Sequence, residues 1–284
     1  WYNNNGAPMS PWNNPSVVFN FPTTFTDEID LMENWNLISF DIAMEENAPE
    51  DVFQSLISDD QLVYVTGFKD DGSIFFDPNG LPFLNTLTSM ERCYSLYKTI
   101  QYIAKGNVLG DVVECGVWRG GSAMLAALTL IENKQTHRKI YLYDTYEGMP
   151  EPIEKDIDIN GIPYRLLWKK EKDILTIPLD EVRKNMLSTG YPSENIIFVK
   201  GMVQDTIPRT LPYQIALLRL DTDLYESTYH ELVYLYPKVS PRGVVIVDDY
   251  GHFQGAREAT DKYFNETSQN ILFHRIDYSC RVGV

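Results

Sequence analysis

The sequence contains few cysteines and few histidines. Its three cysteines, Cys93, Cys115 and Cys280, are odd in number and far apart, which argues against a disulfide framework and favours a reducing compartment. We therefore expect a cytoplasmic protein. No cysteine pair has the spacing of metal ligands and the four histidines do not pair, so a zinc site is not expected and any metal would need oxygen ligands.

Positive charge and long apolar runs are also scarce. The chain has 24 Lys and Arg against 40 Asp and Glu, a formal net charge of −16, which would repel a nucleic acid or an anionic membrane. No apolar run has the length of a membrane span, and no signal peptide is recognised. Because residue 1 is Trp and not Met, we expect a part of a longer protein.

Two regions of the 284-residue chain differ in pattern. Residues 1–84 begin with an Asn- and Pro-rich arm and carry no recognisable chemistry; we expect a lid or oligomerisation region there, and hence a homo-oligomer. In residues 85–284, helices and apolar strands alternate. The expected strands are 111–117, 139–144, 196–201, 215–221 and 243–249, followed by a hairpin-like pair in "ILFHRI" and "CRVGV". The expected helices are 89–106, 122–133, 180–188, 227–236 and 255–266.

This alternation indicates an α/β fold with a mostly parallel sheet covered by helices on both faces. Such sheets bind ligands beyond the carboxyl ends of their strands. The stretch 151–178 interrupts the alternation at that edge, and we expect it to form a mobile lid over the substrate.

The first strand of this region runs into a glycine-rich turn, "VVECGVWRGGSA". Gly116, Gly120 and Gly121 permit a tight turn and close approach to a ligand, but the spacing is not that of a dinucleotide site. Glu114 would repel a pyrophosphate and suit a cationic ligand. S-adenosylmethionine, which carries an ammonium and a sulfonium, fits better. A structural turn with an exposed Glu is the alternative.

Polar residues end the next two strands as well. Asp144 could accept hydrogen bonds from ribose hydroxyls, or could simply initiate a turn. Met202 and Gln204 follow the third strand and could flank an adenine, one through apolar contact and the other through hydrogen bonds.

Carboxylates end the last two of these parallel strands. Asp221 and Asp223 follow one strand, and Asp248 and Asp249 follow the other. If the strands are neighbours, Asp221, Asp248 and Asp249 converge and need a positive partner. Mg²⁺ is the leading candidate, followed by Ca²⁺ and Mn²⁺. Alternatively, one Asp caps the following helix and another faces solvent.

Four stretches together resemble the macrocin O-methyltransferase family. They are "VVECGVWRGGS", "YDTYEGMP", "LDTDLYEST" and "IVDDYGHFQGAREATDKYF", which occur in that order. The resemblance implies a Rossmann-like class I methyltransferase fold with a seven-stranded, mostly parallel sheet and a final antiparallel strand. It also implies transfer of a methyl group from S-adenosylmethionine to a hydroxyl of a natural product, with help from a divalent metal.

The resemblance assigns roles by motif position. Asp221, Asp248 and Asp249 would be metal ligands, and Asp223 would be the general base, with His252 as a second catalytic candidate. Tyr225 and Tyr250 would lie near the acceptor. The cofactor would be lined by Glu114, Gly116, Trp118, Gly120, Gly121, Ser122, Asp144, Met202 and Gln204. The acceptor would be a small sugar, polyketide or phenol, either free or attached to a carrier or synthase.

Two other functions fit parts of the pattern. The "DTD" at 221–223 matches the metal-binding DxD motif of glycosyltransferases, although the Glu114 turn suits a cation better than a diphosphate. A non-catalytic binding module with a retained fold is the second alternative, against which the intact carboxylates argue.

Overall fold

The computed structural model describes residues 65–68, 74–77 and 85–284. The chain divides into two compact units, Trp1–Ala48 and Pro49–Val284, and every described residue belongs to the second. Strands β1 (Val65–Phe68) and β2 (Ile74–Asp77) form an antiparallel pair. The rest of the predicted arm at 1–84 lies outside the described residues, so the boundary at residue 84 and the role of the arm stay predictions.

The regular alternation predicted from residue 85 onward is present. The strands of the main sheet are β3 (Asp111–Cys115), β4 (Ile140–Asp144), β5 (Ile196–Lys200), β6 (Ile215–Leu220), β7 (Val239–Val247), β8 (Phe273–Arg275) and β9 (Arg281–Gly283). The helices are α2 (Met90–Lys105), α3 (Gly121–Glu132), α4 (Arg165–Leu175), α5 (Leu179–Ser188), α6 (Val203–Thr206), α7 (Tyr225–Leu235) and α8 (Gln254–Glu266), with 3₁₀ turns η2 (Ser193–Asn195) and η3 (Tyr236–Lys238).

The main sheet has seven strands in the order β5-β4-β3-β6-β7-β9-β8. The five strands from β5 to β7 pair in parallel, and β9 pairs antiparallel with both β7 and β8. The predicted parallel sheet with a final antiparallel strand is therefore confirmed. Chain order reverses direction at β3, which places the crevice for a ligand beyond the carboxyl ends of β3 and β6.

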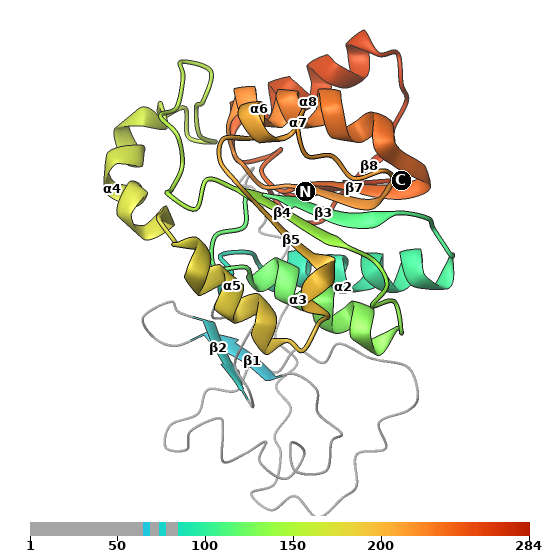
Figure 1. Ribbon diagram of the computed structural model, residues 1–284. Coiled ribbons are helices and arrows are strands. Elements are labelled where there is room, and N and C mark those ends of the chain that lie inside the picture. The colour runs from blue at the N-terminus through green and yellow to red at the C-terminus, as the bar shows by residue number, and fades with distance from the viewer. Residues whose placement is uncertain (1–64, 69–73, 78–84) are drawn as a thin grey trace, which may run out of the picture. The chain divides into compact units, whose positions relative to one another are not determined.

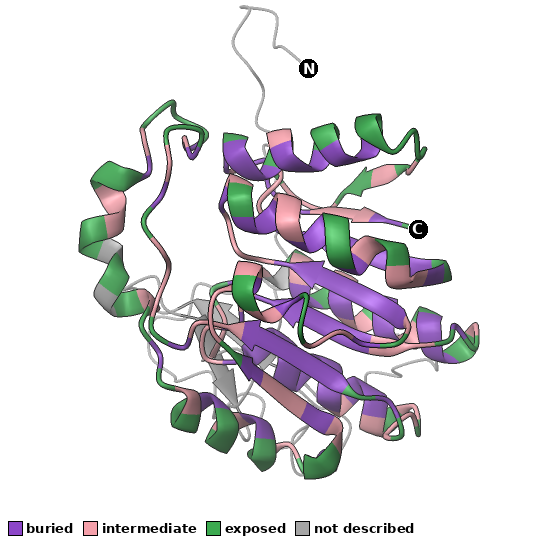
Figure 2. Ribbon diagram, turned by 45° about the horizontal axis from the view of Figure 1, so that its top comes forward, coloured by how far each residue is buried: buried purple, intermediate pink, exposed green. Residues whose placement is uncertain are grey.

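Helices cover the sheet on both faces (Figure 1). Helices α2, α3 and α5 pack on one face in a core that includes Ile100, Met124 and Met186. Helices α6, α7 and α8 pack on the other face, where Ile207 and Leu232 are fully buried. The central strands β3, β4 and β6 are almost entirely buried, whereas the outward faces of the helices are exposed (Figure 2). This double covering explains the continuous apolar runs of the strands.

Side chains alternate between the two cores along each central strand. In β3, Val112 belongs to the α2/α3 core and Val113 to the α7/α8 core. In β7, Ile246 belongs to the former and Val247 to the latter. This period of two also decides the direction of the polar side chains that follow the apolar ones.

The last parallel strand begins earlier than the sequence predicted. Strand β7 starts at Val239 and not at Gly243, although Pro241 cannot donate to a ladder. The register between β6 and β7 shifts between the pairs Ile215–Val239 and Leu217–Val244, so Pro241 lies where the ladder is interrupted.

The interrupting stretch at 151–178 contains helix α4, which the sequence did not predict. Two isolated bridges, Ile157–Pro163 and Asp158–Phe253, and a hydrogen bond from the Gln254 amide to the Ile157 carbonyl (2.9 Å) attach its first half to the start of α8. The mobility expected of this stretch stays a prediction. Among the described residues, no helix combines the length and the apolar character needed to cross a membrane.

Candidate active site

The glycine turn after β3 lies directly against the end of β6. Gly116 has a φ of 81°, which favours glycine. A Cβ atom at Gly116 would lie 1.9 Å from the carbonyl oxygen of Asp221. The amide of Asp221 donates to the carbonyl of Cys115 at 2.8 Å, which holds the two strand ends together. The turn predicted to bind a cofactor and the carboxylates predicted to bind a metal therefore share one backbone contact.

Helix α3 begins at the end of this turn. Gly120 is its N-cap, with a φ of 88° and no side-chain cap, and the helix starts at Gly121. Ser122 is buried, and its hydroxyl oxygen lies 3.4 Å from that of Thr86. The amides of the first turn of this 12-residue helix carry partial positive charge, which suits a carboxylate.

Asp144 braces the same turn from the end of β4. One of its carboxylate oxygens accepts hydrogen bonds from the amides of Val117 (2.7 Å) and Trp118 (3.3 Å). The other accepts from the amide of Tyr146, two residues on, at 2.7 Å. Asp144 is thus a turn residue, as the alternative interpretation expected, and it fixes the loop at the ligand edge. A ribose contact stays a prediction.

Met202 and Gln204 lie at the start of α6, after β5. Met202 is the N-cap of this helix, and the side-chain oxygen of Gln204 is buried without a hydrogen-bond partner among the described atoms. A cavity of about 660 Å³ opens at the ends of β4 and β5. Its lining includes Thr145, Met149, Trp168, Lys172, Lys200 and Met202. The unpartnered amide oxygen favours the predicted ligand contact.

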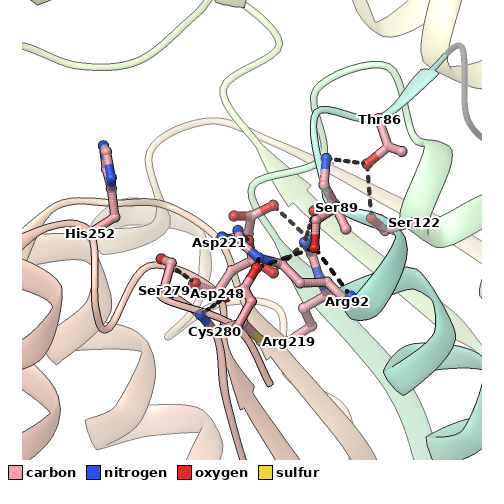
Figure 3. Close-up of polar contacts among 12 residues, drawn as sticks. Thr86, Ser89, Arg92, Ser122, Arg219, Asp221, Asp248, His252, Ser279 and Cys280 are labelled. Carbon is pink, nitrogen blue, oxygen red and sulfur yellow. Dashed lines mark hydrogen bonds and ion pairs between the residues drawn. The ribbon is translucent and has the colours of Figure 1, made fainter. Parts of the chain in front are cut away.

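A buried arginine in β6 organises the charges at the centre of the edge (Figure 3). Arg219 is 3% exposed and is the register neighbour of Glu114 on β3. Its guanidinium binds the carboxylates of Glu114 (2.6 Å), Asp221 (2.7 Å) and Asp248 (2.7 Å), and the hydroxyl of Thr88 (2.9 Å). Surrounding carboxylates hold the guanidinium in its charged form despite burial.

Glu114 therefore has its cationic partner within the protein. It is buried and not exposed, which corrects the structural alternative of an exposed Glu. Burial raises its pKa to about 7, while the charge of Arg219 opposes that shift. Glu114 therefore does not require a cationic ligand to balance its charge, because Arg219 supplies the positive charge.

The two adjacent acids after β7 point in different directions. Asp248 is buried and forms ion pairs with Arg219 and with Arg92 of α2. Arg92 also binds Asp277 at 2.7 Å. Asp249, in the turn that follows β7, meets Asp223. The two neighbouring carboxylates therefore have different partners.

Three carboxylates converge next to this ion-pair network. Oxygen atoms of Asp221, Asp223 and Asp249 all lie within 4.8 Å of one another. One oxygen of Asp249 is buried and has no hydrogen-bond partner among the described atoms. Burial and neighbouring negative charge raise the pKa values of Asp221 and Asp249 well above their usual range. A divalent cation with oxygen ligands fits this donor set.

The structure thus brings together a different trio from the one predicted for the metal. Asp221 and Asp249 belong to both sets, but Asp223 takes the place of Asp248. Asp248 instead forms ion pairs with the guanidinium groups of Arg92 and Arg219.

The remaining predicted residues lie farther from the carboxylates. Figure 3 shows His252 pointing away from the Arg219 cluster, and its Nδ1 is 3.2 Å from the Tyr278 hydroxyl. The Tyr250 hydroxyl donates to Asp261 of α8 at 2.7 Å, and the Tyr225 ring stacks on Tyr229. These contacts hold both tyrosine rings along α7 and α8, which weighs against the predicted acceptor contacts.

Trp118 combines a backbone and a side-chain role. Its φ of 48° lies in the left-handed region, and its indole donates to the carbonyl of Ile174 in α4 at 3.0 Å. The indole of Trp168 in α4 donates to the carbonyl of Met149 at 2.9 Å. These two bonds attach α4 to the glycine turn and to the loop after β4.

Sequence reasoning missed Arg219 and Arg92. Arg219 had a readable signal, since it is a charged residue within the otherwise apolar strand "IALLRL". A buried charge requires a partner, and the nearest unexplained carboxylates were those after the neighbouring strands. Arg92 had no comparable signal, because helix α2 carries several other charged residues.

Comparison with known proteins adds family information to this geometry. Residues 46–282 match the model of a family described as macrocin O-methyltransferase (TylF). The 8-demethyl-8-(2,3-dimethoxy-alpha-L-rhamnosyl)-tetracenomycin-C 4'-O-methyltransferase of Streptomyces olivaceus is 34% identical over 179 residues, 63% of this chain and 67% of that protein. The mycinamicin III 3''-O-methyltransferase of Micromonospora griseorubida is 31% identical over 180 residues, 63% of this chain and 70% of that protein.

A solved structure is similar as well. The O-methyltransferase NovP superimposes with a TM-score of 0.64 at 31% sequence identity, covering 70% of this chain and 81% of that chain. The strand order and the final antiparallel strand agree with the Rossmann-like methyltransferase fold that the sequence predicted.

Proposed function

Because the chain belongs to the macrocin O-methyltransferase family and is therefore an O-methyltransferase, we propose that it methylates a sugar hydroxyl of a natural product with S-adenosylmethionine as donor and a divalent cation as cofactor. The Streptomyces olivaceus relative, whose name places its methyl group on a rhamnosyl compound, supports the sugar acceptor. Family membership decides against a glycosyltransferase and a non-catalytic module. Homo-oligomerisation and a carrier- or synthase-bound acceptor stay predictions.

The observation that carries the cation proposal is the carboxylate trio of Asp221, Asp223 and Asp249. Glu114 and Asp248 lie beside the trio, and Arg92 and Arg219 are guanidinium groups paired with carboxylates of this edge. The trio offers only oxygen ligands, and within the described part of the chain a buried oxygen of Asp249 has no hydrogen-bond partner. Mg²⁺ suits this set, with Mn²⁺ and Ca²⁺ as alternatives.

The cofactor would lie on the neighbouring strand ends. Its amino acid end would face the turn from Gly116 to Ser122, where the first amides of α3 suit its carboxylate. Its ribose would lie near Asp144, and its adenine near Met202 and Gln204 at the 660 Å³ cavity. The sulfonium would then be close to the end of β6, because Gly116 touches the backbone of Asp221.

The reaction displaces the methyl group from sulfur by attack of the acceptor oxygen. A C–O bond forms as the C–S bond breaks, which yields a methyl ether, S-adenosylhomocysteine and a proton. The bound cation would lower the pKa of the acceptor hydroxyl. Asp223, one of the three carboxylates, would accept the proton, and the turn after β3 would align the two substrates.

Metal binding and methyl transfer test this proposal together. Wild-type protein should bind Mn²⁺, lose methyl transfer to a rhamnosylated acceptor in EDTA, and regain it with excess Mg²⁺. The variants Asp223→Asn and Asp248→Asn show which of these two residues binds the cation together with Asp221 and Asp249. If the geometry is right, Asp223→Asn weakens Mn²⁺ binding at least tenfold and Asp248→Asn does so less.

A change in a matched residue outside the site serves as the control. Asp180→Asn alters an exposed carboxylate in the first turn of α5 and should leave Mn²⁺ affinity unchanged. A stronger effect of Asp248→Asn than of Asp223→Asn would restore the assignment made from sequence. Full activity after exhaustive chelation would make the trio structural and the cation proposal wrong.

A further inference from the structure

One buried carboxyl contacts the loop that carries Asp221 and Asp223 but has no part in the proposed reaction. Glu231 of α7 is 0% exposed, and both of its oxygens lie near the hydroxyl of Thr222, at 3.0 and 3.1 Å. Thr222 is the residue between Asp221 and Asp223. Burying a carboxyl in an apolar core is costly, so a role beyond packing is expected.

The backbone around Thr222 is strained. The amide of Leu224 donates to the carbonyl of Thr222 at 2.6 Å, which closes a three-residue turn around Asp223. Asp223 has a φ of 63° in this turn. Three-residue turns with positive φ are rare and strained, and such a conformation persists only when its surroundings fix it.

Two contacts fix this conformation. The hydroxyl of Ser227 donates to the Thr222 carbonyl at 3.4 Å, a weak bond. The hydroxyl of Thr222 is held by Glu231 on the α7 side. The side chain of Thr222 is thereby attached to α7. The carboxylates on either side of it, Asp221 and Asp223, have oxygen atoms within 4.8 Å of an oxygen of Asp249.

We propose that Glu231 is a positioning residue, which holds Thr222 so that Asp221 and Asp223 keep the spacing that a divalent cation requires. This inference rests on the proposed cation site. Burial raises the pKa of Glu231 to about 8, so a neutral carboxyl faces the threonine hydroxyl at pH 7 and adds no charge to the trio. An amide of the same shape can therefore replace it.

The test measures Mn²⁺ affinity by electron paramagnetic resonance, without cofactor or acceptor. Thr222→Val keeps the shape but removes the hydroxyl, and should weaken Mn²⁺ binding about 10–100-fold, as losses of outer hydrogen bonds to ligands do. Thr222→Ser and Glu231→Gln keep the hydrogen bond and should bind within about threefold of wild type. In turnover, Thr222→Val should lower kcat while the KM for S-adenosylmethionine changes little, because the proposed cofactor site lies at the ends of β3, β4 and β5.

Thr260→Val is the control, since Thr260 is fully buried, more so than the half-buried Thr222, and its hydroxyl donates to the carbonyl of Ala256 at 2.8 Å in α8. It should bind Mn²⁺ like wild type. If Thr222→Val does not fold, Thr222→Ala replaces it. Wild-type Mn²⁺ affinity in the variant that lacks the hydroxyl, Thr222→Val or its replacement Thr222→Ala, overturns the positioning role. A loss in Thr260→Val as large as that in Thr222→Val overturns it too. Absence of Mn²⁺ binding in the wild type overturns the cation site itself, and this inference with it.

Discussion

Replacing Gly116 by alanine should damage the carboxylate cluster although the residue carries no side chain of its own. The new Cβ would lie 1.9 Å from the carbonyl oxygen of Asp221 and 2.6 Å from its carbonyl carbon. Ordinary contacts between such atoms are longer than about 3.4 Å, so the end of β6 would have to move by more than an ångström. Asp221 would then leave its position beside Asp249.

The expected loss of stability has two parts. A φ of 81° costs an alanine about 1–2 kcal/mol relative to glycine. The clash adds about 1–3 kcal/mol, typical of an overpacked core. Gly116→Ala should therefore lower the free energy of unfolding by about 2–5 kcal/mol.

Gly190 offers a control for the first part alone. It has a φ of 74°, and a Cβ there would meet no atom within 4 Å. Gly190→Ala should cost only about 1–2 kcal/mol and leave the carboxylates in place. Urea unfolding of both variants gives the stabilities, and Mn²⁺ titration reports on the cluster. Equal stability losses, or unchanged Mn²⁺ affinity in Gly116→Ala, would refute the argument that this glycine is needed for contact with Asp221.

Two further changes test the buried polar groups. Gln204→Leu removes a buried oxygen that has no hydrogen-bond partner among the described atoms. It should raise the stability of the cofactor-free protein by about 1 kcal/mol and weaken S-adenosylmethionine binding by about 1–3 kcal/mol in calorimetry. Unchanged affinity would exclude Gln204 from the cofactor site. The pKa values of Glu114 and Glu231 are raised to about 7 and about 8 in the folded chain, so their contribution to stability is full below about pH 4 and is lost as the pH rises through these values. Urea unfolding in EDTA should therefore show a fall in stability from about pH 4.5, the pKa of an unfolded Glu, to about pH 8, the pKa of Glu231 in the folded chain. Glu231→Gln should reduce that fall, and an equal fall in the variant would contradict the raised pKa of Glu231.

The sheet was predictable because its strands are buried on both faces. Apolar runs of five to seven residues ending in Gly or Asp located β3, β4, β5 and β6 to within one or two residues. Helix α4 escaped prediction because its amphipathic pattern falls within a charged stretch that reads as a loop. The start of β7 was misplaced because a proline usually lies outside a ladder, whereas here a register shift accommodates it.

The candidate site was predictable as a place but not as a set of contacts. Strand ends located Glu114, Asp144, Asp221 and Asp249 at one edge, since parallel strands share a carboxyl edge. Side-chain direction depends on parity and register, which a single sequence does not provide. From the sequence, the positive partner of Glu114 was predicted to be a cationic ligand. The register of β3 against β6 instead places Arg219 beside Glu114.

The two acids that follow β7 divide one sequence motif between two surroundings. Asp248 forms ion pairs with Arg92 and Arg219, which tie α2 to the sheet. Asp249 meets Asp221 and Asp223, and one of its buried oxygens has no hydrogen-bond partner among the described atoms. Arg219 also binds Asp221 at 2.7 Å, so one guanidinium links the two groups of carboxylates. The proposed cation would offset the remaining negative charge beside Asp249, and the Asn variants of Asp223 and Asp248 measure this division directly.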